Sequence, residues 1–187
     1  MALIAAALLP LGGCAGSASV SIVPLNFQRI SPTGPLIYEF SPKECYYWIN
    51  DAKELCIAMT VQKKFLRPGV NQEEFHLSLV LEGLPAGDAR TYPFNTRTVR
   101  GRNRQGLSNT RFASIDGVAA VWDFGKDELH GRFEFRGLQQ SYMVLMGWAY
   151  TRQVLCFGEF AARLSREKGE AILMKTEKEA MRRGVQE

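Results

Sequence analysis

The stretch 75–81, FHLSLVL, places an apolar side chain at every second position, from Phe75 through Leu77 and Leu79 to Leu81. Side chains of a β-strand point alternately to the two faces of its sheet, so this period of two predicts a strand with one buried face. The polar side chains between them are then expected on the opposite, exposed face.

A hairpin is predicted on the N-terminal side of that strand. Residues 45–49 (CYYWI) and 55–61 (LCIAMTV) are rich in the aromatic and β-branched side chains that suit a pleated sheet. Asn50 and Asp51 can supply a two-residue turn between them, because both residue types tolerate positive φ. The fold is therefore expected to be built from antiparallel neighbours.

This turn would set Cys45 directly opposite Cys56, at a separation where a disulfide is sterically possible. An exported domain would make that bond chemically reasonable. The alternative is two buried free thiols, which are common core residues. Cys156 lies in the apolar run 154–157 and is expected in the core in either case.

Further strands are predicted on both sides of this central region. The candidates cover residues 20–24, 36–40, 118–124, 129–135, 142–150 and 153–161. The pair Thr151-Arg152 is expected to turn the chain between the last two. Many strands with short connections predict a mostly β fold, an antiparallel β-sandwich or small barrel with a C-terminal α-helix. The β domain is assigned to 22–163 and the helical tail to 164–187.

The tail differs in composition from the rest of the chain. From Glu170 to Arg183 the residues are good helix formers, and Gly184 is a natural stop. A thin apolar stripe includes Leu173 and Met174. Two interpretations remain open: a solvated helix packed loosely on the sheet, or a helix that docks on a partner.

The first residues indicate the compartment. Residues 2–11 contain no polar side chain, and Gly12, Gly13 and Cys14 follow directly. The run is too short to span a bilayer as a helix but has the length of the apolar region of a secretory signal. The string Leu11-Gly12-Gly13-Cys14 resembles the lipobox of bacterial lipoproteins.

This resemblance covers residues 1–15 only and implies where in the cell the protein is located. It implies a signal peptide over 1–13, acylation of Cys14, and a lipid anchor followed by a flexible tether over 14–21. Ala15 stands where an aspartate would favour inner-membrane retention. The implied location is the bacterial cell envelope, at the outer membrane facing the periplasm or the surface.

The chain shows no motif of an enzyme or a metal site. The two histidines, His76 and His130, lie far apart in strand patterns, and both are expected on exposed strand faces. No nucleophile elbow, phosphate loop or zinc-type spacing is present, so no catalytic residue, cofactor or metal is assigned. The net charge of +4 is too small to indicate nucleic-acid binding.

The most unusual stretch runs from Arg90 to Arg111 and contains no acidic residue. Arginine presents a planar fork that suits carboxylate, phosphate and sulfate groups. One interpretation is a solvated hairpin loop whose charges aid solubility. The other is a loop that binds an anion or a partner, and the candidate residues for it are Arg97, Arg100, Arg102 and Arg104.

Three functions follow as expectations. The first is a membrane-anchored, non-enzymatic structural or binding subunit with a protein partner, which predicts a contiguous apolar patch instead of a cleft. The second is a module that binds cell-wall glycan, a lipid headgroup or another anionic polymer, favoured if Tyr46 or Trp48 is exposed beside arginines. The third is a hydrolase assembled only in the fold, favoured if His76 or His130 lines a pocket beside a carboxylate.

Overall fold

The computed structural model describes residues 16–25, 37–63, 73–85, 88–105, 108–125, 128–143 and 148–181. Its elements are β1 (Ser17–Pro24), β2 (Tyr38–Phe40), β3 (Glu44–Ile49), β4 (Leu55–Lys63), β5 (Glu73–Leu81), β6 (Ala89–Phe94), β7 (Val99–Gln105), β8 (Ser108–Trp122), β9 (Glu128–Met143), β10 (Trp148–Leu164) and α1 (Arg166–Met181). The predicted fold class is confirmed, because the described residues form one mostly antiparallel sheet and one C-terminal helix. None of these described residues forms a helix with the length and apolar character needed to cross a membrane.

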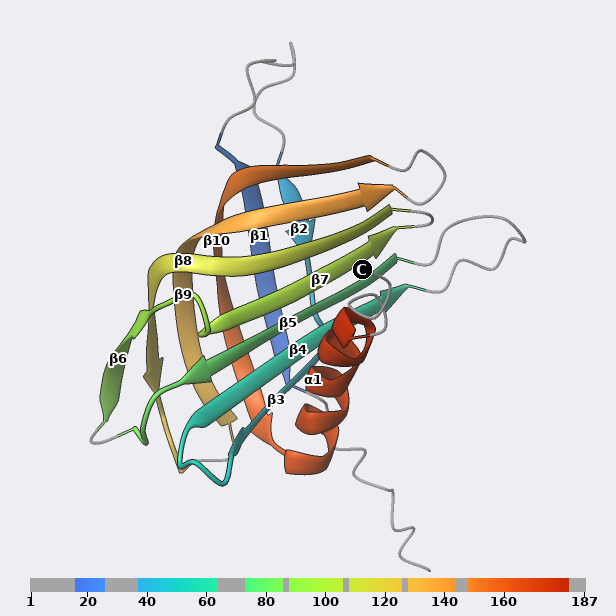
Figure 1. Cartoon of the computed structure of the whole chain (residues 1–187). Coiled ribbons are helices and arrows are strands. Elements are labelled where there is room, and N and C mark those ends of the chain that lie inside the picture. The colour runs from blue at the N-terminus through green and yellow to red at the C-terminus, as the bar shows by residue number, and fades with distance from the viewer. Residues whose placement is uncertain are drawn as a thin grey trace, which may run out of the picture.

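The sheet closes on itself (Figure 1). Strands β3, β4, β5, β7, β8, β9 and β10 pair in this order, each antiparallel to the next. The end of β10 then pairs in parallel with β3, at Arg163 with Tyr46 and Leu164 with Tyr47. Closure is the feature expected of the small-barrel alternative.

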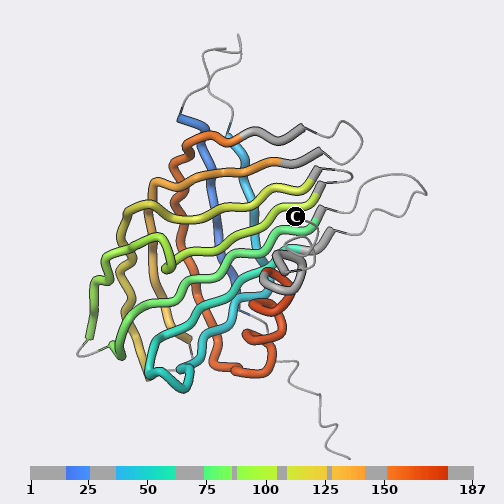
Figure 2. Tube along the Cα trace, in the orientation of Figure 1, coloured from blue at the N-terminus to red at the C-terminus, as the bar shows by residue number. Residues whose placement is uncertain are grey.

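The long strands β8, β9 and β10 bend and so divide the sheet into two layers (Figures 1 and 2). The first half of β8 pairs with β7 and its second half pairs with β6, and a register shift between Ser114 and Asp116 separates the halves. Gly117 follows at φ 154°, where a Cβ would collide with the backbone of Glu134. A β-bulge bends its strand, so this site turns β8 from one layer into the other.

The core lies between the two layers. The predicted buried face of residues 75–81 is confirmed, because Phe75, Leu77, Leu79 and Leu81 are all buried. Phe75 stacks on Phe40 of β2 with ring centroids 4.1 Å apart. This pair joins β5 of one layer to the edge strand of the other.

Helix α1 packs on the outer face of β3, β4 and β5, as the front of Figure 1 shows. It covers a second apolar cluster that includes Tyr46, Trp48 and Ile172. Gly169 faces the indole of Trp48 so closely that a Cβ there would lie well under 3.0 Å from ring carbons. The interpretation of a loosely packed solvated helix is therefore wrong for the face that includes Gly169 and Ile172, while Met174 on the other side is exposed.

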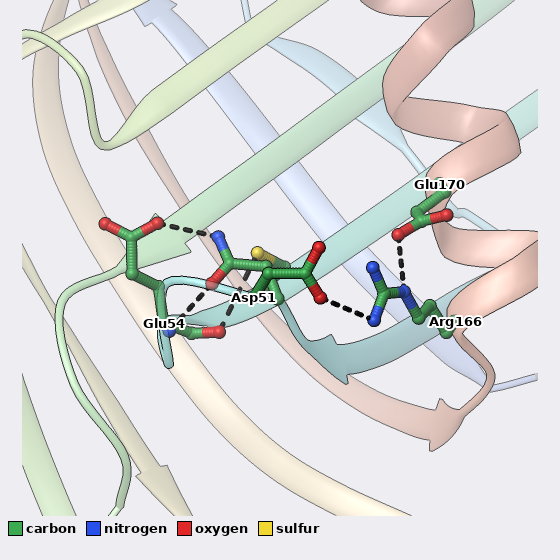
Figure 3. A network of polar contacts seen from close by, with 6 residues as sticks. Asp51, Glu54, Arg166 and Glu170 are labelled. Atoms are coloured by element: carbon green, nitrogen blue, oxygen red, sulfur yellow. Dashed lines mark hydrogen bonds and ion pairs between the residues drawn. The ribbon is translucent and has the colours of Figure 1, made fainter.

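A polar network connects the start of α1 to the β3–β4 connection (Figure 3). The guanidinium of Arg166 contacts the Asp51 carboxylate at 3.0 Å and the Glu170 carboxylate at 2.7 Å. Within the connection, the Glu54 amide donates to Asn50 Oδ1 at 2.9 Å. The side chain of Asn50 thus closes a loop over residues 50–54, so the predicted two-residue turn at Asn50 and Asp51 is wrong.

The longer loop changes the register and separates the cysteines. Cys45 pairs with Met59, while Cys56 pairs with Trp48. Because this register is three residues away from the expected one, Cys45 and Cys56 lie in different clusters on opposite faces of the sheet. The predicted disulfide is therefore wrong, and both thiols are free. Burial raises the pKa of Cys56 to about 11 and also raises the pKa values of Cys45 and Cys156.

Three other boundaries differ from the sequence-based expectation. β1 begins at Ser17, so residues 17–21 are a strand and not part of a tether. Thr151 and Arg152 lie inside β10, and the chain passes from β9 to β10 between Met143 and Trp148. The arginine-rich stretch is not one loop, because most of it forms β6, β7 and the start of β8.

Candidate functional site

The outer face of β1, β10, β9, β8 and β6 is the strongest candidate for a functional surface. α1 packs on the other layer, against β3, β4, β5 and β7, and leaves this face open. Paired residues share a face of a sheet, so the registers place Ser21, Phe157, Glu134 and Val118 in one row across four strands. Uncovered sheet faces with apolar side chains are where soluble domains meet ligands or partners.

A groove of about 640 Å³ lies on this face, in place of the uninterrupted apolar patch that the partner expectation predicts. Its lining residues are Ser19, Ser21, Thr91, Val118, Ala120, Arg132, Phe133, Glu134, Phe157, Gly158 and Glu159. The flanking side chains of Ser19, Ser21, Thr91 and Ala120 are short, which leaves the space open. Phe157 presents an apolar surface there, since 39% of it is exposed.

Charges of both signs surround that apolar centre. Glu159 of β10 lies opposite Arg132 of β9 in the strand register. Glu134 is two residues further along β9 on the same face. The groove thus offers one guanidinium and two carboxylates beside the hydroxyl groups of Ser19 and Ser21. Such a lining suits a ligand that carries both donors and acceptors better than one with a single sign of charge.

A second hollow of about 410 Å³ continues the groove toward the start of β1 and shares Ser19 and Glu159 with it. It contains Trp122 and His130, which are stacked with ring centroids 6.4 Å apart. His130 is half-buried against this indole, so the expectation of an exposed strand position is only partly met. Together the two hollows extend the open surface along β10.

His76 contradicts the prediction of an exposed face, because its exposed fraction is 0%. Its Nδ1 lies 2.8 Å from Thr60 Oγ1. Its Nε2 lies 2.8 Å from Glu74 Oε1, within ion-pair distance. Sequence alternation placed His76 on the outer face correctly, but α1 packs over that part of the sheet.

Thr60, His76 and Glu74 include the residue types of a nucleophile, a base and a carboxylate. The hydrolase expectation required His76 or His130 in a pocket beside a carboxylate. His76 and Thr60 are both buried and line neither the groove nor the second hollow, so their contacts support the fold. His130 does line the second hollow, together with Glu159, and its ring is stacked on Trp122. Among the described residues, no cluster of His, Cys, Asp and Glu could hold a metal ion.

Burial lowers the pKa of His76, although the Glu74 carboxylate acts in the opposite direction. As the pH falls below about 6.5, His76 of the unfolded chain binds a proton that His76 of the native protein still excludes. Proton binding therefore stabilises the unfolded state relative to the native state. We expect the free energy of unfolding to drop by up to about 1.4 kcal/mol per pH unit there, and to level off below the native pKa. Chemical denaturation at a series of pH values measures this slope.

The variant His76→Gln is expected to be less stable at neutral pH and to lose this part of the slope. His130→Gln keeps His76 in place and should therefore retain it. An unchanged slope in His76→Gln would show that other groups cause the pH dependence.

The arginine candidates divide into three environments. Arg100, Arg102 and Arg104 alternate along β7 and share its outer face, with Arg111 of β8 paired to Arg102. Arg102 is buried and donates from Nε to Asn109 Oδ1 at 3.1 Å, so it is not an exposed binding residue. Arg100 and Arg104 are exposed on that face, while Arg97 is exposed in the turn between β6 and β7.

Two other sequence-based expectations have different outcomes. Tyr46 and Trp48 are buried under α1, so they cannot serve as the exposed aromatics expected of a glycan module. Cys14 and the signal peptide lie outside the described residues.

Sequence reasoning missed the groove, whose lining comes from five strands distributed along the chain. The available signal was Phe157. It alternates with the buried Cys156 and therefore had to lie on the other face of its strand.

Searches against protein-family models, curated proteins and solved structures find no match to this chain.

Proposed function

We propose that this chain is a non-enzymatic binding protein of the bacterial cell envelope, anchored to a membrane through Cys14, which holds a partner protein along the groove at Phe157. The observation that supports this proposal is the uncovered sheet face with its groove, on the layer opposite α1. Ala15 after the cysteine supports the outer membrane as the address, in keeping with the lipobox resemblance.

The lining of the groove favours a protein segment over a uniformly charged polymer. Protein interfaces combine an apolar centre enriched in aromatic residues with a polar rim. Phe157 and Val118 supply such a centre, and Arg132, Glu134 and Glu159 supply the rim. Opposite charges at fixed positions give orientation and selectivity rather than strong attraction to one sign.

Site-specific photo-crosslinking in cells tests the proposal. A photoreactive amino acid at Thr91, which is exposed and lines the groove, is expected to capture one defined envelope protein. The matched control is Thr151, which is also exposed but lies on the outer face of the other layer. In the same strain, Phe157→Ala and Glu134→Lys should each reduce the Thr91 product about tenfold or more, as expected when a central contact or a rim charge is altered.

The other outcomes separate the alternatives. Equal capture from Thr91 and Thr151, or capture that Phe157→Ala leaves unchanged, would contradict the proposed groove. Binding of an anionic polymer would instead depend on the exposed arginines of β7, so it should fall with salt and in an Arg100→Gln, Arg104→Gln variant. It should not respond to Phe157→Ala.

A further inference from the structure

Three of the exposed large apolar side chains lie at one end of the closed sheet. Leu164 at the end of β10 is 67% exposed, Leu84 in the loop after β5 is 41% exposed and Phe124 after β8 is 37% exposed. We name Leu84, Phe124 and Leu164 the apolar rim. The end of β10 that leads into α1, and with it Leu164, is at the lower end of Figure 1.

The registers place the rim residues around one end. Ala161 of β10 pairs with His130 of β9, which pairs with Trp122 of β8, and Phe124 follows two residues later. Leu84 lies at the same end, because its carbonyl accepts a hydrogen bond from Arg90. Arg90 follows Ala89 in β6, and Ala89 pairs with Trp122. All three rim residues therefore lie at the same end of the sheet.

The chain enters the domain at this same end. Ser17, the first residue of β1, pairs with Ala161. Gly16 is buried so tightly that a Cβ would overlap the carbonyl oxygens of Ala161 and Cys45. The backbone is thus already part of the sheet at residue 16, and only Ala15 separates it from Cys14. Two residues span at most about 7 Å, so an acylated Cys14 would hold Gly16 at the bilayer surface.

We propose that the apolar rim rests on the lipid surface, with Leu164, Phe124 and Leu84 in the interfacial region of the bilayer. This inference rests on the proposed anchor at Cys14. It adds an orientation: the strand axis of β1 stands up from the membrane, and the groove opens sideways above the rim. The second hollow, with Trp122 and His130, is then the end of the groove nearest the lipid.

Two of the cations near the rim are paired with carboxylates. Arg163 is paired with Glu128 at 2.9 Å, and Arg166 is paired with Asp51 at 3.0 Å. Arg90 donates to the Leu84 carbonyl and adds a cation beside the rim, which favours acidic headgroups. We expect apolar contact to hold the rim on a zwitterionic bilayer as well, and more tightly on an acidic one.

Depth measurements on the lipidated full chain in phosphatidylcholine vesicles test the inference. The cysteines at positions 45, 56 and 156 are buried, so a single engineered thiol can be labelled selectively. An environment-sensitive fluorophore at Phe124→Cys is expected to shift to the blue and to be quenched by nitroxides attached to the lipid chains. The matched control is Ile37→Cys, which is also exposed and lies beside the opposite end of β1.

The outcomes distinguish the rim from the anchor. Vesicle flotation of the wild type, with loss of flotation in Cys14→Ala, supports the anchor alone. If the protein floats but the label at residue 124 behaves as the label at residue 37 does, the rim inference is overturned and the anchor stands. If the wild type does not float, the anchor fails. In that case, labels at residues 124 and 164 that remain aqueous at high lipid concentration would overturn the rim as well.

Discussion

The variant Phe75→Ala is expected to lower the free energy of unfolding by about 3–5 kcal/mol, because truncating a fully buried aromatic side chain leaves a cavity. Phe75 is completely buried and stacks on Phe40, so its loss also weakens the contact between the two layers. Urea denaturation followed by circular dichroism at fixed pH measures the change.

The matched variant Phe157→Ala removes the same atoms from an exposed position on the groove. It is expected to cost about 1 kcal/mol or less, because surface substitutions away from packed sites have small effects. Similar losses for the two variants would contradict the assignment of Phe157 to a binding surface, since it would then be a packing residue.

The variant Gly169→Val is expected to displace α1 from the sheet. A valine Cβ would overlap the ring of Trp48, and the rigid indole is enclosed by β3, β4 and the helix itself. Valine has a higher helix propensity than glycine, so any loss of stability must come from this contact. We expect a loss of at least about 2 kcal/mol, together with a red shift of tryptophan emission as Trp48 meets water.

Ala171→Val is the control for that experiment, because residue 171 lies on the exposed side of α1. It also introduces valine into the helix but should leave the emission maximum unchanged. A wild-type spectrum and stability in Gly169→Val would show that α1 does not pack on Trp48.

The sequence predicted the strands better than their connections. The alternation at 75–81 predicted the buried face correctly, because the side chains that face the core are apolar and those between them point to the other side of the sheet. The turn at Asn50 and Asp51 was wrong because the Asn50 side chain closes a longer loop with Glu54, a choice that propensity does not reveal. That difference of loop length changed the register and removed the predicted disulfide.

Long-range packing accounts for the remaining differences. His76 sits on the outer face that its strand pattern requires, but α1, almost 100 residues later, covers that face. β7 was expected as a loop because its outer face carries arginines and its inner face carries Gly101, whose missing side chain admits Leu77 and Phe112. A period of two is present there, yet the residues between the arginines are Gly101 and Asn103 rather than apolar ones.

The parallel pairing of β10 with β3 has a consequence for the order of folding. Tyr46 can find its partner Arg163 only after nearly the whole domain has emerged, so the ring cannot form on a chain still being synthesised or threaded across a membrane. Pairings between strands far apart in the sequence slow folding, because the chain loses the entropy of closing the long loop before the contacts form that stabilise the pair. During that interval the edges of β3 and β10 stay unpaired and invite aggregation. A chain with this topology benefits from a chaperone that protects it until its last strand arrives.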